Sequence, residues 1–227
     1  MTLRANARIA GVTFLLYIVT AIGGMILFDR ASGGVGTAAR LASIAQHPTL
    51  VRLSALLILL EFLYPVVLAV TIYALTRDQD RDLALVAVGC RFTEGVIAAI
   101  AAGNRLDLLS VATAGATATG AERAAANALG ALLLGGGDSI SATCFALGST
   151  IYCWLFLRAR SIPVALAGLG LFASALLVVA LPVQIAGFLH GPATGLIWIP
   201  MAAFEVTLAV WLIVKGVAVR PRSPSPA

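Results

Sequence analysis

Six long apolar runs constrain this chain more than any other feature of its sequence. Each run has about 20 residues or more, the length that a helix needs to cross a hydrocarbon core about 30 Å thick. Only helices and closed barrels satisfy their backbone groups in hydrocarbon, and these runs lack the strict alternation of a barrel strand. The sequence therefore predicts an all-α, polytopic integral membrane protein, built as a bundle of six transmembrane helices. We expect the spans at about 7–28, 49–75, 83–109, 139–157, 163–189 and 195–217.

The composition agrees with this class. Hydrophobic residues make up 60% of the 227 residues and charged residues 11%, against about 25% charged in soluble globular domains. The first run follows Arg4 and Arg8 and is longer than the apolar region of a signal peptide, so we interpret it as a retained helix. We expect one membrane domain over residues 1–219 and a disordered tail, rich in Pro and Ser, over 220–227.

Two of the outer connections are long enough to contain helices of their own. The stretches Thr37–Gln46 and Glu122–Leu134 carry apolar residues at helical spacing. This pattern predicts two short interfacial helices along the outer surface. Such helices could cover a cavity between the spans or shield the ends of the spans.

The basic residues of the loops predict the orientation, because cytoplasmic loops are enriched in Arg and Lys. With the N-terminus inside, the cytoplasmic segments hold Arg4, Arg8, Arg77, Arg81, Arg158, Arg160, Lys215, Arg220 and Arg222. The opposite side holds Arg30, Arg40, Arg52, Arg105 and Arg123. We therefore expect both termini in the cytoplasm. The net charge of +5 then reflects topology rather than a nucleic-acid partner. The preference for Arg over Lys and the abundance of Ala and Gly are typical of a GC-rich bacterial genome. We expect the chain in the bacterial inner membrane.

Short motifs along the chain resemble one known family. They comprise the stretch from Ala7 to Ile18, the segment Arg91-Phe-Thr-Glu94, the segment from Leu157 to Pro163, Glu205, and the closing stretch from Trp211 to Gly216. In these motifs the chain resembles an uncharacterised bacterial membrane family, the domain of unknown function 4386. The resemblance implies a six-span fold, and it implies no activity and no catalytic residues.

Four ionisable residues lie deep inside the predicted spans: Glu61, Arg91, Glu94 and Glu205. A charge at the centre of a bilayer costs about 2.5–3.5 kcal/mol on insertion scales, so each needs a partner, water or a changed protonation state. Arg91 and Glu94 share a face at i,i+3. We expect the second, third and sixth spans to meet here, with Arg91 paired to Glu205 and Glu94. Because three carboxylates face one guanidinium, one or two of them should hold a proton, or the group should bind a cation or an amine.

Pro65 adds a backbone irregularity beside this group. It follows Glu61 by four residues and has no N–H, so the Glu61 carbonyl loses its donor within the helix. A carbonyl freed in this way, together with the hydroxyl of Tyr64, is a suitable ligand for a cation or for water. Interrupted helices at mid-membrane are a sequence indicator of transporter sites.

Our leading hypothesis is a small transporter or a proton-linked membrane protein. Glu61 and Glu94 would carry protons or cations, Tyr64 would add a ligand, and Arg91 and Glu205 would set the local field. One alternative is a structural or partner-binding membrane protein whose buried ion pairs fix helix packing. Another is an intramembrane enzyme that uses the same carboxylates.

An enzyme is the less favoured class, because the sequence contains no HExxH, GxSxG or phosphate-loop motif. We expect no metal and no cofactor. The partners that we expect are the lipid bilayer and a proton, a cation or a small molecule. The sequence indicates neither a particular substrate nor an oligomeric state.

Overall fold

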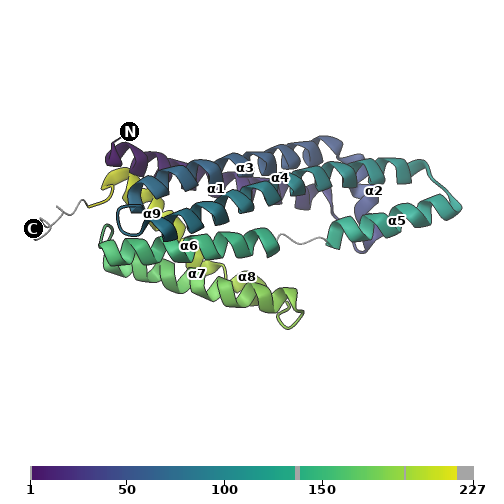
Figure 1. Cartoon of the computed structure of the whole chain (residues 1–227). Helices are drawn as coiled ribbons and strands as arrows, with labels where there is room; N and C mark the ends of the chain where they lie inside the picture. Colours follow the sequence, from purple (N-terminus) through teal and green to yellow (C-terminus); the bar gives the residue numbers. More distant parts are fainter. Residues whose placement is uncertain (1, 136–138, 192, 219–227) are drawn as a thin grey trace, which may run out of the picture. The chain divides into compact units, whose positions relative to one another are not determined.

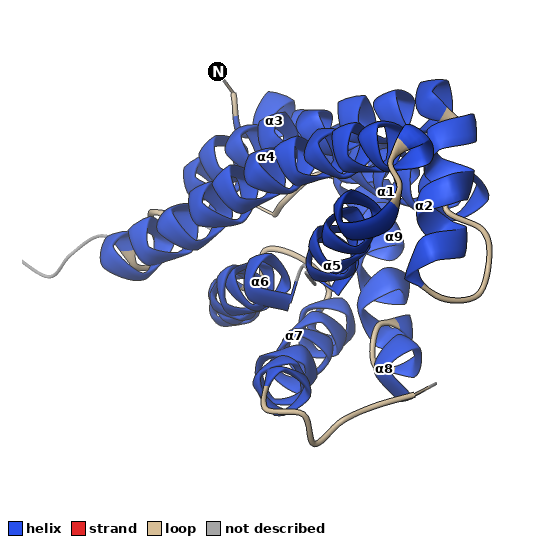
Figure 2. Cartoon of the chain, turned by 90° about the vertical axis from the view of Figure 1, so that its right-hand side faces the viewer, coloured by secondary structure: helices blue, strands red, loops and turns tan. Residues whose placement is uncertain are grey.

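A computed structural model describes residues 2–135, 139–191 and 193–218, and all regular structure in these residues is helical (Figure 2). In chain order the helices are α1 (Leu3–Ala31), α2 (Thr37–Gln46), α3 (Pro48–Thr76), α4 (Arg81–Thr117), α5 (Gly120–Gly135), α6 (Ser139–Ala159), α7 (Val164–Ile185), α8 (Ala193–Leu196) and α9 (Ile199–Val214) (Figure 1). Within the described part, six segments are long and apolar enough to cross a membrane: α1, α3, α4, the stretch Gly120–Ala159 that contains α5 and α6, α7, and Thr194–Val214. The predicted six-span, all-α fold is confirmed.

The two short helices expected between spans are both present. The first is α2, with the bounds that the sequence predicted, and the second lies within α5. Their place along the outer surface of a membrane stays a prediction. The expected tail at 220–227 lies outside the described residues.

The third span differs most from its expected bounds. We expected its end at residue 109, whereas α4 continues to Thr117 and has 37 residues. At 1.5 Å per residue this helix is roughly 55 Å long, well beyond a hydrocarbon core of about 30 Å. Its last turns are rich in Ala, a strong helix former, and the hydroxyls of Ser110 and Thr113 donate to carbonyls one turn back.

The fifth and sixth spans end or break at proline and glycine. We expected one helix over 195–217, but α8 and α9 are separate, and Pro200 lies in the first turn of α9. Pro200 has no N–H for the Leu196 carbonyl, so a continuous helix would lack a bond here. In the fifth span α7 ends at Ile185, earlier than the expected 189, three residues after Pro182 and shortly before Gly187, whose φ is +80°.

The chain divides into two compact units, which we describe separately. The first unit consists of Met1–Leu15, Pro65–Glu94 and Ala142–Ala227, and the second of Leu16–Tyr64 and Gly95–Ser141. Helices α1, α3 and α4 contribute residues to both units. The single membrane domain expected over 1–219 stays a prediction.

Small residues allow the helices of the first unit to approach closely. A Cβ added at Gly11 of α1 would lie 2.6 Å from the Ala209 carbonyl oxygen of α9. A Cβ at Gly148 of α6 would lie 3.1 Å from Cβ of Cys90 in α4. Close contact at small residues is the usual packing of membrane helices. It brings α4, which carries Arg91 and Glu94, against α6, and it brings α1 against α9, which carries Glu205.

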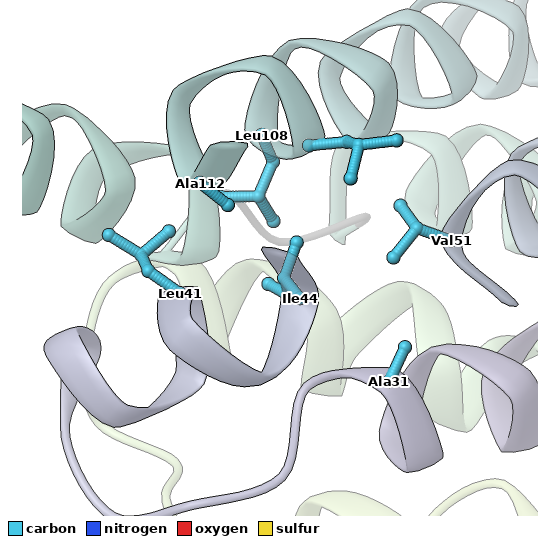
Figure 3. Close-up of a cluster of buried hydrophobic side chains, with 7 residues drawn as sticks. Ala31, Leu41, Ile44, Val51, Leu108 and Ala112 are labelled. Atoms are coloured by element: carbon cyan, nitrogen blue, oxygen red, sulfur yellow. The ribbon is translucent and has the colours of Figure 1, made fainter. Parts of the chain in front are cut away.

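The second unit has an apolar cluster at the ends of its long helices. Leu41 and Ile44 of α2 point towards Leu108 and Ala112 of α4 (Figure 3). Ala31 of α1, Val51 of α3 and Leu109 of α4 complete the buried cluster. Helix α2 therefore shields helix ends, which is one of the two roles that the sequence left open for it.

Candidate functional site

A buried ion pair on α4 is the centre of the candidate site. Arg91 is 1% exposed and Glu94 is 2% exposed, and Nη1 of the arginine donates to Oε2 of the glutamate over 2.8 Å. The two residues are three apart, so they face the same side of the helix. Charge-assisted hydrogen bonds of this length are among the stronger ones in proteins.

Two aromatic rings from other helices cover the guanidinium. Its central carbon lies 4.7 Å from the ring centroid of Phe145 in α6 and 5.8 Å from that of Phe14 in α1. A cation over an aromatic face is attracted by the ring quadrupole, by about 2 kcal/mol where water is excluded. The rings therefore supply part of the stabilisation that water would give to a charge on the surface.

A small cavity adjoins Arg91 within the first unit. The space open to the centre of a water-sized sphere is about 10 Å³, close to what one water molecule needs. Its polar lining residues are Arg91, Ser149, Tyr152 and Glu205. The rest of the lining is apolar or sulfur-containing: Phe14, Ile72, Cys153, Phe156, Met201, Phe204 and Leu208.

Three polar atoms around this cavity lack a hydrogen-bond partner in the described part of the chain. They are Oε1 of Glu205, Oγ of Ser149 and the phenolic oxygen of Tyr152, all on residues that are buried. Buried polar groups are normally satisfied, so such a group calls for an explanation such as a water, an ion or a functional role. The cavity thus gathers unused hydrogen-bonding capacity beside a fixed positive charge.

Helical periodicity explains how two helices contribute to the cavity. On α6 the lining residues Ser149, Tyr152 and Phe156 follow at intervals of three and four. On α9 the residues Met201 and Glu205 are one turn apart. Residues at these spacings share one face of a helix.

The family of the chain follows from comparison with known proteins. The model of the family named domain of unknown function DUF4386 matches residues 9–216, nearly the whole chain. The chain belongs to the DUF4386 family. No curated protein and no solved structure matches it.

In this DUF4386 protein, part of the predicted site comes together in the first unit. Arg91, Glu94 and Glu205 all belong to that unit, and the predicted pairing of Arg91 with Glu94 is present. Arg91 and Glu205 line the same cavity, and their expected pairing stays a prediction.

The other two predicted site residues belong to the second unit. Glu61 and Tyr64 lie on α3, and both are partly buried. The ring of Tyr64 packs edge-on against that of Tyr17 of α1, with 6.3 Å between the ring centroids. Helix α3 continues through Pro65, whose ring nitrogen carries no N–H.

Sequence reasoning missed the contribution of the fourth span. Ser149 and Tyr152 carry two of the three unpartnered oxygens at the cavity, yet neither is charged, so neither stood out in an apolar run. The only available signal was their spacing of three, which places two hydroxyls on one face of a helix. Among the described residues, no group of three or more His, Cys, Asp or Glu side chains could hold a metal ion.

Proposed function

We propose that this DUF4386 protein is a proton-linked membrane protein whose proton site is the cavity between Arg91 and Glu205. One observation carries the proposal: Glu205, 8% exposed, has a carboxyl oxygen with no hydrogen-bond partner in the described part of the chain and lines the same cavity as a buried guanidinium. A carboxyl group without a fixed partner is free to take up and release a proton, and intramembrane carboxyl groups often mark proton pathways.

A role in helix packing accounts poorly for Glu205. The ion pair between Arg91 and Glu94 joins two residues of the same helix, α4. Glu205 sits on α9, where an apolar side chain of similar size would pack without an unsatisfied oxygen. The carboxyl of Glu205 is costly to bury, so its presence at this position is better explained by a function than by a contribution to stability.

The size of the cavity favours a proton over a larger solute. Space for about one water molecule admits a water or a proton, and it excludes an organic molecule. When Glu205 is ionised, its charge competes with Glu94 for Arg91. When it is protonated, Arg91 is left to Glu94. A proton on Glu205 would therefore change the pairing of the guanidinium, and through it the contacts that α4 makes with its neighbours.

Glu61 and Tyr64 form a second candidate position for a proton in this proposal. They lie three residues apart on α3, next to the proline inside that helix. The location that we propose is a bacterial inner membrane with both termini in the cytoplasm, and its support is the distribution of Arg and Lys among the loops.

Proton movement in liposomes tests this function. The purified chain is reconstituted with a pH-sensitive dye inside the vesicles, and the internal pH is followed after an external acid step. Glu205→Gln keeps the size of the side chain but cannot carry a proton, so we expect proton entry to slow at least tenfold. The matched control is Glu122→Gln on the exposed face of α5, which should match wild type.

Thermal unfolding of the same samples separates function from folding. We expect Glu205→Gln to unfold at or above the wild-type temperature, since it removes a carboxyl that is costly to bury. Wild-type flux no faster than in protein-free vesicles, or equal flux in wild type and Glu205→Gln, would overturn the proposal. A loss of stability without any proton flux would favour the role in helix packing, which the contacts of Arg91 with Phe14 and Phe145 support.

A further inference from the structure

A second, larger pocket of the first unit lies where three spans end. Its volume is about 390 Å³, within the range of small-molecule sites. One wall is the connection from α6 to α7, and the other is the C-terminal end of α9 with the residues after it. The lining residues are Arg160, Ser161, Ile162, Pro163, Val164, Trp211, Lys215, Gly216, Val217 and Ala218.

Backbone hydrogen bonds hold the two walls together. The N–H of Ala218 donates to the Ser161 carbonyl over 2.8 Å, which joins the two segments directly. Within its own wall, the N–H of Ser161 donates to the Phe156 carbonyl at the end of α6. Gly216, with φ +73°, ends α9 in a left-handed conformation. The pocket is therefore built by the fold and does not depend on side chains alone.

The chemistry of the lining suits an anion. Arg160 and Lys215 bring two positive charges, and no acidic residue is among the described residues that line the pocket. The first turn of α7 begins at Val164, so its leading N–H groups have no carbonyl within the helix, and such N–H groups favour phosphate.

Ser161 gives an independent indication of a ligand. It is 6% exposed, it lines the pocket, and its Oγ has no hydrogen-bond partner in the described part of the chain. A hydroxyl buried in this way usually has a partner. Rotation of this hydroxyl towards the pocket would let it donate to an anion oxygen there.

Arg160 occupies a backbone conformation that favours glycine. Its φ is +49°, and it is the non-glycine residue with positive φ in the described part of the chain. For such a residue the left-handed region costs about 1–2 kcal/mol. This conformation ends α6: the N–H of Arg160 donates to the Leu157 carbonyl and the N–H of Ser161 donates to the Phe156 carbonyl, the pattern of a Schellman helix end. It places Arg160 in the lining of the pocket.

We propose that this pocket binds a phosphate group, and that an anionic phospholipid headgroup supplies it. The pocket lies at the ends of α6, α7 and α9, where a membrane would place headgroups, and Trp211 is a residue typical of that level. Ile162 and Val164 give the pocket an apolar side for the upper part of an acyl chain. Basic pockets between membrane helices on the cytoplasmic side are known to take acidic headgroups. This site is independent of the proton site at Glu205.

The test compares lipids and free phosphate on the full-length chain. The protein is placed in nanodiscs of phosphatidylcholine, of phosphatidylcholine with increasing phosphatidylglycerol, or of phosphatidylcholine with inorganic phosphate in the buffer. Bound lipid is counted by native mass spectrometry, and the thermal unfolding midpoint is followed over the same titration. We expect phosphatidylglycerol to be retained and to raise the midpoint, and inorganic phosphate to have little effect.

Three variants decide whether the pocket is responsible. Arg160→Gly and Lys215→Gln should each weaken phosphatidylglycerol retention at least tenfold, the usual loss for a charge-assisted hydrogen bond. Arg160→Gly should unfold no earlier than wild type in phosphatidylcholine alone, because glycine relieves the positive φ. The control Arg77→Gln removes an exposed charge at the end of α3 and should weaken retention no more than about fivefold, the effect of one surface charge.

Each outcome bears on the proposal. The proposal would be overturned if all three variants lost phosphatidylglycerol retention to the same extent. It would also be overturned if the wild-type protein retained phosphatidylglycerol no better than phosphatidylcholine. If inorganic phosphate protects as well as the lipid does, the pocket binds free phosphate and the lipid source is wrong.

Discussion

Arg91 keeps a charge inside a membrane helix because three groups replace water around it. Glu94 accepts a hydrogen bond on the same helix, and the rings of Phe14 and Phe145 cover the guanidinium from two others. Each contact is modest alone, at a few kcal/mol or less. Together they fix the side chain where Glu205 shares its cavity. These contacts explain why the charge is tolerated inside the helix bundle. Oε1 of Glu205, at the same cavity, has no hydrogen-bond partner in the described part of the chain.

Glycine at position 170 makes another close contact in the same unit. A Cβ there would lie 2.4 Å from Cε2 of Phe204 and 2.6 Å from Sγ of Cys153, both of which also line the cavity. We predict that Gly170→Ala lowers the free energy of unfolding by about 1–3 kcal/mol, because the ring and the sulfur must move.

A matched control lies two residues earlier on the same helix. A Cβ at Gly168 would meet nothing within 4 Å, so Gly168→Ala should be neutral or stabilising by about 0.5–1 kcal/mol. Thermal unfolding of both variants in detergent checks the pair. Equal effects of the two substitutions would show that the contact at Gly170 is not as close as described.

Helix α2 shows how a short element depends on its neighbours. It has ten residues, too few for a stable isolated helix in water, where about 12–15 are needed. Its apolar side lies on the cluster formed with α1, α3 and α4 (Figure 3), and Leu41 also reaches α5, where a Cβ added at Gly130 would meet its side chain. The extension of α4 beyond its expected end carries part of this cluster.

Removal of one side chain should loosen α2. We predict that Ile44→Ala destabilises the α2 region by about 2–5 kcal/mol, because a fully buried side chain is replaced by a cavity. Hydrogen exchange should then be faster in the amides of α2. The control Val35→Ala changes a side chain that is 98% exposed and should leave exchange in α2 unchanged. Unchanged protection in Ile44→Ala would contradict the packing of α2 described here.

At the scale of the whole molecule, lipid is the solvent of much of the surface. Large apolar side chains are exposed along every long helix, among them Val19, Leu56, Ile100, Phe172 and Val210. In water such a surface would drive aggregation, whereas in a bilayer it is the ordinary exterior of a spanning helix. The DUF4386 chain is therefore a multi-pass membrane protein by its surface as well as by its helix lengths.

The orientation in the membrane gives a prediction at this scale. In a background without the native cysteines Cys90, Cys144 and Cys153, a membrane-impermeant thiol reagent should label Gln79→Cys only from the cytoplasmic side. It should label Val35→Cys only from the opposite side, since one span separates the two positions. Labelling in intact cells and in inverted vesicles measures from which side of the membrane each of the two cysteines is accessible. Val35→Cys labelled from the cytoplasm would reverse the proposed topology, and labelling of both positions from one side would contradict the span between them.

The sequence by itself determined the features that depend on residues close together in the chain, within a single helix. The six spans follow from runs of apolar residues, the two short helices from apolar spacing, and the pair of Arg91 with Glu94 from an interval of three. Span ends were less predictable, because Ala-rich turns continued α4 while Pro200 divided the last span. All these features arise within one helix, where rise and period are fixed.

Only the tertiary structure decided which faces of different helices meet. It placed Ser149 and Tyr152 at the cavity with Glu205, gave Arg91 its aromatic neighbours, and brought Arg160 and Lys215 to one pocket. These residues are far apart in the chain, and their proximity depends on how each helix is rotated and how closely small residues let helices approach. Hydrophobic periodicity says little about rotation in a membrane, because lipid and protein interior are both apolar. Contacts between side chains in the folded bundle settle that rotation.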